Sequence, residues 1–374
     1  MNAPLVTFGV PVYGGKDSVP TTLECLRTQT YANIEVLISV NAADQASAEA
    51  CKPFLQRDSR FRMYVQSSHL GWAGSVDWTM RERKGDFYIY LHCDDQVSPT
   101  YVADLVEAAT RWPDAAICFS EMAISGERRV LVRDRPVLGD PISRALTHIE
   151  RLDASVFRGL IRGSMLDTTR GMRISELDSY GSEHPLMTEL ALAGEFRFVR
   201  GPTYFKRIDQ QHMGLKSYMW PEHRKRDNWA CLAAWLVGVI VPVGSSLEQR
   251  RMLFDHVAQR FFAKPTGFLN WLRLRSAWVQ TLRNEALARA FRTLMDMGRQ
   301  SGYLDSWIKG GTRAMFYVPD PSDSAAMTAL VRAFVDHLRR EAIFDPNSSL
   351  GWSWETLEGE LAGRFPRLHQ HAEA

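Results

Sequence analysis

The stretch FYIYLHCDD, residues 87–95, decides the fold, because a continuously apolar run ends there in two adjacent carboxylates. The run is short and rich in aromatic side chains, and it lacks the polar alternation of a one-sided sheet. These features predict a strand that is covered on both faces. Asp94 and Asp95 then lie at the carboxyl end of that strand, where open α/β sheets bind their ligands.

Apolar runs of the same kind precede and follow this stretch. They cover residues 5–12, 34–40, 61–65 and 115–120, and helical patterns between them cover residues 18–26, 44–57, 72–83 and 100–112. Strands that alternate with helices at this spacing predict right-handed βαβ units. We therefore expect an α/β fold with a mostly parallel sheet flanked by helices.

The sequence pattern changes near residue 214. Beyond it helix-forming sequence dominates, strand alternation is hard to find, and eight of the eleven tryptophans occur. A chain of 374 residues is also longer than one compact domain usually needs. We predict an α/β domain over residues 1–214, with halves at about 1–120 and 121–214, followed by a mainly helical C-terminal domain over residues 215–374.

The composition argues against several classes of protein. With 45 basic and 43 acidic residues the net charge is +2, which gives no reason to expect a nucleic-acid partner. The five cysteines are odd in number and lack metal-ligand spacing, which is typical of a reducing compartment. The apolar segment 230–243 is shorter than the roughly 18–20 residues of a membrane span, and the N-terminus lacks a signal-peptide pattern. We expect a cytoplasmic protein.

The two acids at the strand end are the main candidates for chemistry. Adjacent carboxylates repel each other, and a hard divalent cation relieves that repulsion. Mg²⁺ or Mn²⁺ is often held by one or two carboxylates, with the phosphates of a substrate completing its ligand shell. The alternative is that one acid caps the helix beginning at Pro99 while its neighbour is solvated. Neither a dinucleotide fingerprint nor a P-loop follows the first strand.

Several ordered segments resemble glycosyltransferase family 2, whose members have the GT-A fold. The resemblance covers roughly residues 4–212. The similar segments are VPVY (10–13), LRTQTY (26–31) with IEVLI (34–38), GWAG (71–74) with GDFYI (85–89), LHCDD (91–95), and EH (183–184) with LALAG (190–194) and YFKR (204–207). Each segment is a weak pattern alone, whereas their common order and spacing are specific.

The resemblance implies inverting transfer of a sugar from a nucleoside-diphosphate sugar to a hydroxyl group of a glycan or of a lipid-linked or protein acceptor. The halves at 1–120 and 121–214 would bind the nucleotide sugar and the acceptor. Asp94 and Asp95 would form the DXD-type motif that binds Mn²⁺ or Mg²⁺, with His212 as a further metal ligand. The residues implied in binding the nucleotide sugar are Pro11, Val12, Tyr13, Asn41, Gly71, Trp72, Asp94 and Arg207.

The attacking hydroxyl needs a general base, for which the resemblance offers two candidates. Glu183 lies at the head of a predicted helix, where the helix dipole favours a carboxylate. His184 stands where the family has the second acid of its "ED" pair, and imidazole titrates near neutrality. A second departure is Asn41, which replaces an aspartate of many members and leaves a neutral contact to the base of the nucleotide.

Two other functions remain open. A GT-A scaffold that has lost catalysis and serves in binding or assembly is favoured by Val40 and His184, and the retained pair of acids argues against it. A sugar nucleotidyltransferase on a related fold would need a glycine-rich signature with a basic residue after the first strand, and the segment 14–16 matches that only faintly.

The C-terminal region has no motif of its own. Segments 268–278 and 281–297 show helical spacing of apolar and basic residues, which is typical of helices packed in a bundle. The alternative is a basic, aromatic face that contacts an anionic lipid-linked acceptor or the inner membrane surface, which would make the protein peripheral to that membrane.

Overall fold

The computed structural model describes residues 3–126, 130–177, 179, 181–208, 221–263, 324–340 and 344–364. The chain divides into two compact units, Met1–Met213 and Gly214–Ala374. Each unit contains buried apolar side chains of its own.

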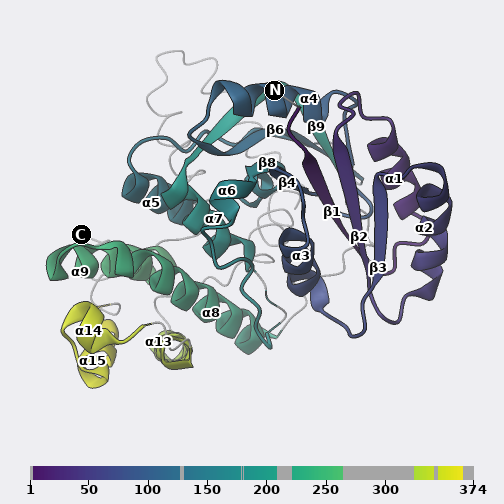
Figure 1. Cartoon of the computed structure of the whole chain (residues 1–374). Helices are drawn as coiled ribbons and strands as arrows, with labels where there is room; N and C mark the ends of the chain where they lie inside the picture. Colours follow the sequence, from purple (N-terminus) through teal and green to yellow (C-terminus); the bar gives the residue numbers. More distant parts are fainter. Residues whose placement is uncertain are drawn as a thin grey trace, which may run out of the picture. The chain divides into compact units, whose positions relative to one another are not determined.

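The first unit is built on one sheet. Its strands are β1 (Val6–Val12), β2 (Ile34–Val40), β3 (Phe61–Val65), β4 (Phe87–Tyr90), β5 (Gln96–Val97), β6 (Ala115–Gly126), β7 (Val130–Val132), β8 (Leu160–Arg162) and β9 (Glu195–Ile208). Their order is β3-β2-β1-β4-β8-β6-β9-β5, and β7 pairs with β6 (Figure 1). Strands β1 to β4 are parallel, as the βαβ pattern predicts. Beyond β4 the sheet is mixed, because β8 is antiparallel to both β4 and β6 while β6 and β9 are parallel.

Helices cover both faces of this sheet. They are α1 (Val19–Arg27), α2 (Gln45–Arg57), α3 (Gly71–Arg81), α4 (Tyr101–Arg111), α5 (Pro141–Arg151), α6 (Gly163–Leu166) and α7 (Glu183–Ala193). Apolar side chains of α1, α2 and α4 belong to one core cluster, and those of α3 and α7 belong to another. Figure 1 shows α1 and α2 on one side of β1–β3 and α3 on the other.

Alternation along β4 divides its side chains between the two clusters. Phe87 and Ile89 pack into the first cluster, whereas Tyr88 and Tyr90 pack into the second. This two-sided burial explains why the strand reads as continuously apolar. The strand ends at Tyr90, so Asp94 and Asp95 lie in the turn that follows its carboxyl end.

The position of α7 is set at its C-terminal end by a buried arginine of α5. Arg144 donates from Nε to the carbonyl oxygen of Ala191 at 2.7 Å and from Nη2 to that of Leu192 at 3.0 Å. The last carbonyls of a helix have no partner within the helix, so this guanidinium satisfies them. It thereby anchors the helix whose first residue is Glu183.

The described part of the second unit is helical, as the sequence predicts. Its α-helices are α8 (Glu222–Ile240), α9 (Leu247–Ala258), α13 (Ser324–Arg340), α14 (Pro346–Leu350) and α15 (Trp354–Arg364). The apolar segment 230–243 forms the end of α8 and a short 3-10 turn, and its residues 230–241 are buried. None of the described helices has the length and apolar character needed to span a bilayer. Segments 268–278 and 281–297 lie outside the described residues.

Candidate active site

Asp95 is buried at the carboxyl end of β4 and faces strand β9. Its side chain is 2% exposed. Its Oδ2 accepts a hydrogen bond from the Tyr204 hydroxyl at 2.6 Å, and its Oδ1 accepts one from the main-chain N–H of Arg207 at 3.1 Å. Burial, together with the charge of Asp95, holds the pKa of Tyr204 well above its usual value, so the phenol remains a donor. Asp95 is therefore held as an oriented carboxylate.

Asp94 points to a different partner. Its Oδ1 lies 2.5 Å from Nδ1 of His92, and its side chain is 10% exposed whereas that of His92 is 40% exposed. His92 stands two residues before Asp94, so the loop itself supplies a partner for this carboxylate. The two acids thus differ, with Asp94 at the more open side of the loop.

Helix α1 supports this loop from behind through a buried threonine. The hydroxyl of Thr22 lies 3.0 Å from the carbonyl oxygen of Cys93 and 2.9 Å from that of Asp95. The hydroxyl has one proton to share between these two acceptors. Both carbonyls flank the acids, so α1 holds the main chain of the loop in place.

The predicted nucleotide-binding residues of the first two strands lie at their carboxyl ends. Pro11 and Val12 are buried in β1, and Tyr13 beyond them is 70% exposed. The Tyr13 ring contacts the ring of His69 edge-on, with centroids 5.6 Å apart. The side-chain amide of Asn41 contacts Nδ1 of the same histidine. His69 therefore joins Tyr13 and Asn41, although sequence reasoning did not identify it.

Gly71 and Trp72 begin helix α3. Gly71 has φ +67°, a conformation that favours glycine, and it lets the chain turn directly from His69 into the helix. Trp72 donates from Nε1 to the hydroxyl of Tyr90 at 2.7 Å. The tryptophan is thus fixed against β4, beside the strand that leads into the acids.

The two candidate bases face different surroundings. Oε2 of Glu183 is buried and has no hydrogen-bond partner within the described residues. Burial raises the pKa of the Glu183 carboxyl, and its own main-chain N–H, Arg158 and Lys206 oppose part of that rise. His184 is 3% exposed, and its Nδ1 lies 3.4 Å from Nε2 of His148 on α5. His184 is therefore buried beside another histidine, whereas Glu183 lies near two cations.

Those two cations were not singled out from the sequence. The guanidinium of Arg158, at the end of the 3-10 helix η1 (Ala154–Arg158), lies 4.4 Å from the ring centroid of Tyr90 and 5.9 Å from that of Tyr204. Lys206 follows Tyr204 by two residues on β9, so both side chains point to one face of the strand. This spacing from Tyr204 is the only feature of the sequence that indicates that Lys206 lies near the acids. Nothing local in the sequence marks Arg158.

Arg207 and His212 have different outcomes. The main-chain N–H of Arg207 binds Asp95, while its side chain is exposed. His212 lies outside the described residues. The prediction that Arg207 binds the nucleotide sugar stays a prediction, as does the prediction that His212 is a metal ligand.

The acids have the chemistry of a magnesium or manganese site that substrate phosphates complete. The described residues contain no group of three or more His, Cys, Asp or Glu side chains arranged to hold a metal ion. Each oxygen of Asp95 accepts one hydrogen bond from the protein, and a carboxylate oxygen has two lone pairs. Two hard-oxygen side chains with phosphate ligands are a common environment for Mg²⁺. The protein would thus supply Asp94 and Asp95, and a nucleotide would supply further oxygens.

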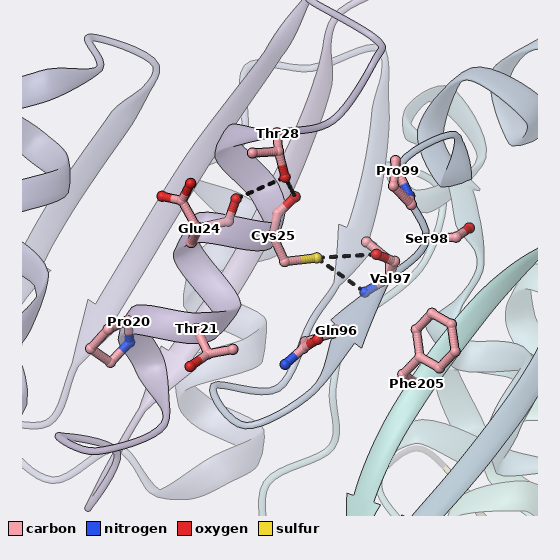
Figure 2. A pocket seen from close by; sticks show the side chains of 10 residues that line it. All are labelled: Pro20, Thr21, Glu24, Cys25, Thr28, Gln96, Val97, Ser98, Pro99 and Phe205. Carbon is pink, nitrogen blue, oxygen red and sulfur yellow. Dashed lines mark hydrogen bonds between the residues drawn. The ribbon is translucent and has the colours of Figure 1, made fainter.

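A separate groove of about 600 Å³ lies between α1 and the β5 edge of the sheet. Figure 2 shows Cys25 reaching from α1 toward Val97. The Cys25 thiol donates to the Val97 carbonyl oxygen at 3.1 Å and accepts from its N–H at 3.2 Å. Strand β5 pairs with β9 on its other side. The thiol therefore forms hydrogen bonds with main-chain groups that would otherwise be unpaired at the edge of the sheet.

Comparisons with known proteins agree on one family for the first unit. Residues 7–173 match the sequence model of the family "Glycosyl transferase family 2". The chain is 29% identical over 118 residues to the putative glycosyltransferase EpsH of Bacillus subtilis, a segment that covers 32% of this chain and 34% of EpsH. It is 29% identical over 100 residues to the glycosyltransferase GlyA of Streptococcus pneumoniae, which covers 27% of this chain and 14% of GlyA. The chain thus spans about a third or less of these relatives.

Solved structures extend the likeness of fold over nearly the whole chain. TarS residues 1–349 of S. aureus, crystallised with UDP, has a TM-score of 0.54 at 10% identity and covers 98% of this chain and 92% of that one. The mannosyltransferase PcManGT of Pyrobaculum calidifontis, in complex with GDP-Man and Mn²⁺, has a TM-score of 0.50 at 13% identity, with 91% and 89% covered. The predicted GT-A-type α/β fold with a mainly helical C-terminal region is confirmed. Over residues 7–173, somewhat less than half of its length, the chain is thus similar to glycosyl transferase family 2.

Proposed function

We propose that the protein is a metal-dependent, inverting glycosyltransferase. It would move a sugar from a nucleoside-diphosphate sugar to a hydroxyl group of a glycan or of a lipid-linked or protein acceptor. The observation that carries the proposal is the pair Asp94–Asp95, which follows the carboxyl end of β4 inside a family 2 domain, with Asp95 held by Tyr204 and Arg207.

The donor and cofactor are supported by the proteins of similar fold. TarS structures contain UDP or UDP-GlcNAc, and the PcManGT structure contains GDP-Man and Mn²⁺. A further relative, 28% identical over 89 residues, is the amylovoran biosynthesis glycosyltransferase AmsB of Erwinia amylovora. A nucleoside-diphosphate sugar and a polysaccharide product follow by analogy. Tyr13, Asn41 and His69 lie together at the strand ends where the nucleotide base would bind.

The proposed metal-binding acids and the proposed base act on opposite sides of the sugar. On one side the bond between the anomeric carbon and the diphosphate oxygen breaks, and the electron pair stays on the diphosphate. Asp94 and Asp95 would hold a divalent cation, which would supply Lewis-acid stabilisation of that charge. On the other side the acceptor oxygen forms the new bond, and its proton goes to Glu183. The raised pKa and unpartnered Oε2 of Glu183 suit it to receive that proton.

The proposal is tested by incubating the protein with a panel of UDP- and GDP-sugars and measuring the release of free nucleoside diphosphate. We expect release with Mn²⁺, loss of release with EDTA, and loss in Asp95→Asn. Asp114→Asn is the matched control, because Asp114 is exposed and its side chain makes no contact with the site. Release that is equal in wild type and Asp95→Asn would contradict the proposal.

A second candidate function is a GT-A module that binds nucleotide sugars without transferring them. Two observations favour it, since both oxygens of Asp95 already accept hydrogen bonds from the protein and His184, at the family's second acid, is buried. Such a module would bind a nucleotide in the same panel but release no diphosphate with any acceptor.

A further inference from the structure

Two cations lie close to the acids of the site without pairing with them. Arg158 is within electrostatic range of Asp95 and Glu183, and Lys206 is within range of Asp94, Asp95 and Glu183. Among the residues that the structure describes, no ion pair or hydrogen bond joins either cation to a carboxylate. Both residues are partly buried. A cation withdrawn from water usually has a direct partner, so we ask which anion these two bind.

Two aromatic side chains lie beside the guanidinium of Arg158. Its guanidinium lies over the ring of Tyr90 at 4.4 Å, and Tyr204 contributes a second ring at 5.9 Å. Its carbonyl oxygen accepts from the Tyr101 hydroxyl at 3.0 Å, which anchors the main chain. A guanidinium stacked in this way keeps its N–H groups in the plane and directed away from the ring. Nη1 of Arg158 is buried and has no hydrogen-bond partner in the part of the chain that the structure describes.

Arg162, four residues later on β8, shows what a structural arginine looks like in the same fold. Its guanidinium lies over the Phe87 ring at 5.1 Å, and it also donates to three main-chain carbonyl oxygens, those of Ala109, Trp112 and Ala115. Stacking on an aromatic ring is therefore common to both arginines. The difference is that Nε and Nη2 of Arg162 donate to the protein, whereas the buried Nη1 of Arg158 has no acceptor among the described residues.

Lys206 places a second charge beside the first. It lies on the face of β9 that also carries Tyr204, whose hydroxyl binds Asp95. Burial and the charge of Arg158 lower the pKa of the Lys206 ammonium, and the three carboxylates oppose that change. Two cations that repel each other are retained beside the acids, which is the arrangement expected around a site for a multiply charged anion.

We propose that Arg158 and Lys206 form a cationic pair that binds the diphosphate of the nucleotide sugar, so that diphosphate binding depends only in part on a divalent metal. The inference rests on the proposed function and adds residues to it. The planar N–H groups of Arg158 match two phosphate oxygens, and Lys206 acts as a point charge. When the bond to the sugar breaks, the charge left on the diphosphate faces groups that the fold already holds in position.

The test is calorimetric titration of UDP and of GDP into the full-length protein, first with EDTA and then with Mn²⁺. For the nucleotide that binds more tightly with Mn²⁺, we expect weaker but measurable binding in EDTA. Arg158→Met is expected to weaken that metal-free binding by about 10- to 100-fold, the loss of a charge-assisted hydrogen-bonding group. Asp95→Asn is expected to lose only the increase that Mn²⁺ brings.

Three further variants guard against misfolding and general charge effects. Lys206→Met removes an ammonium group whose desolvation costs free energy, so the variant should fold. It should also weaken the binding of the nucleotide in the absence of metal. Arg158→Lys keeps the charge without the planar donors and should lie between wild type and Arg158→Met. Arg111→Met removes an exposed arginine paired with Glu107 and should bind as wild type does.

The outcomes separate this inference from the proposed function. If Arg158→Met and Lys206→Met bind the nucleotide in EDTA as tightly as wild type, the cationic pair is refuted while the proposed function stands. If the nucleotide binds only when Mn²⁺ is present, the cationic pair is likewise refuted and the proposed function stands. If neither nucleotide binds under either condition, the proposed function fails as well.

Discussion

At the scale of single residues, Glu183 has the two properties that a general base needs. Its Oε2 is not engaged by another group of the described structure, and burial shifts its pKa toward neutrality. We expect Glu183→Gln to lower kcat by about 10²–10⁴-fold, because general-base assistance contributes that much. Nucleotide-sugar affinity should stay near that of wild type, since the change removes only the proton acceptor.

Steady-state kinetics with a fixed donor and acceptor measures this effect. Glu107→Gln is the control, because it makes the same chemical change at an exposed position of α4. If Glu183→Gln retained full kcat, the base would lie elsewhere, and His184 would be the next residue to replace.

The raised pKa of Glu183 also leads to a prediction about the free energy of unfolding. The carboxyl binds its proton more tightly in the folded than in the unfolded protein, so ionisation costs stability as pH rises through its folded-state pKa. Glu183→Gln removes that cost. The variant should therefore be more stable than wild type at neutral pH, and the gain should vanish below the ordinary glutamate pKa of about 4.3.

Urea unfolding at several pH values measures the free energy of unfolding in the two proteins. A difference that did not change with pH would mean that the Glu183 side chain is solvated in the native state, contrary to its observed burial.

At the scale of elements, helix α1 determines where the loop of the two acids lies. Thr22→Val removes the hydroxyl that serves the carbonyls of Cys93 and Asp95 while keeping the shape of the side chain. Buried carbonyls without a donor cost about 1–3 kcal/mol, so the free energy of unfolding should fall by about that amount. Denaturant titration measures it. Thr21→Val is the matched control because Thr21 is exposed on the same helix, and an equal loss there would contradict the assignment.

Most strands and helices of the first 120 residues could be predicted because they have a clear period, whereas the two-residue strand β5 was too short to show one. Strands β2 and β3 occupy the predicted ranges, and α2 begins at Gln45 after the Asp44 cap. The expected strand 115–120 extends to Gly126 as β6. Its added length depends on pairing with β9, more than seventy positions later in the sequence, and local periodicity does not encode such pairing.

The site was predictable only in part, for a related reason. Asp94, Asp95, Tyr13 and Asn41 each follow a recognisable strand, so position in the sheet identifies them. His69 and Arg158 come from loops and a short 3-10 helix, and only the folded chain brings them to the same sheet edge. Such residues carry no local signal.

At the scale of the whole molecule, the residues of the proposed chemistry lie in the first of two compact units. The family match lies within residues 7–173, and every described residue of the candidate site lies within Met1–Met213. The hydrogen bond between Asp95 and Tyr204 joins the loop after β4 to β9, and Glu183 at the start of α7 lies within electrostatic range of Arg158 and Lys206. The proposed function would therefore draw on both halves of one domain, with Asp94 and Asp95 in the first half and Glu183 in the second.

The most direct test of this account is Mn²⁺ binding in the presence and absence of a nucleoside diphosphate, measured by calorimetry on wild type, Asp95→Asn and Asp114→Asn. Two carboxylates alone form an incomplete site, so the account predicts weak Mn²⁺ binding to the protein and much tighter binding once UDP or GDP supplies phosphate oxygens. Asp95→Asn should lose that increase and Asp114→Asn should keep it. Tight Mn²⁺ binding that survives in Asp95→Asn would contradict the claim that these acids hold the metal of a sugar transferase.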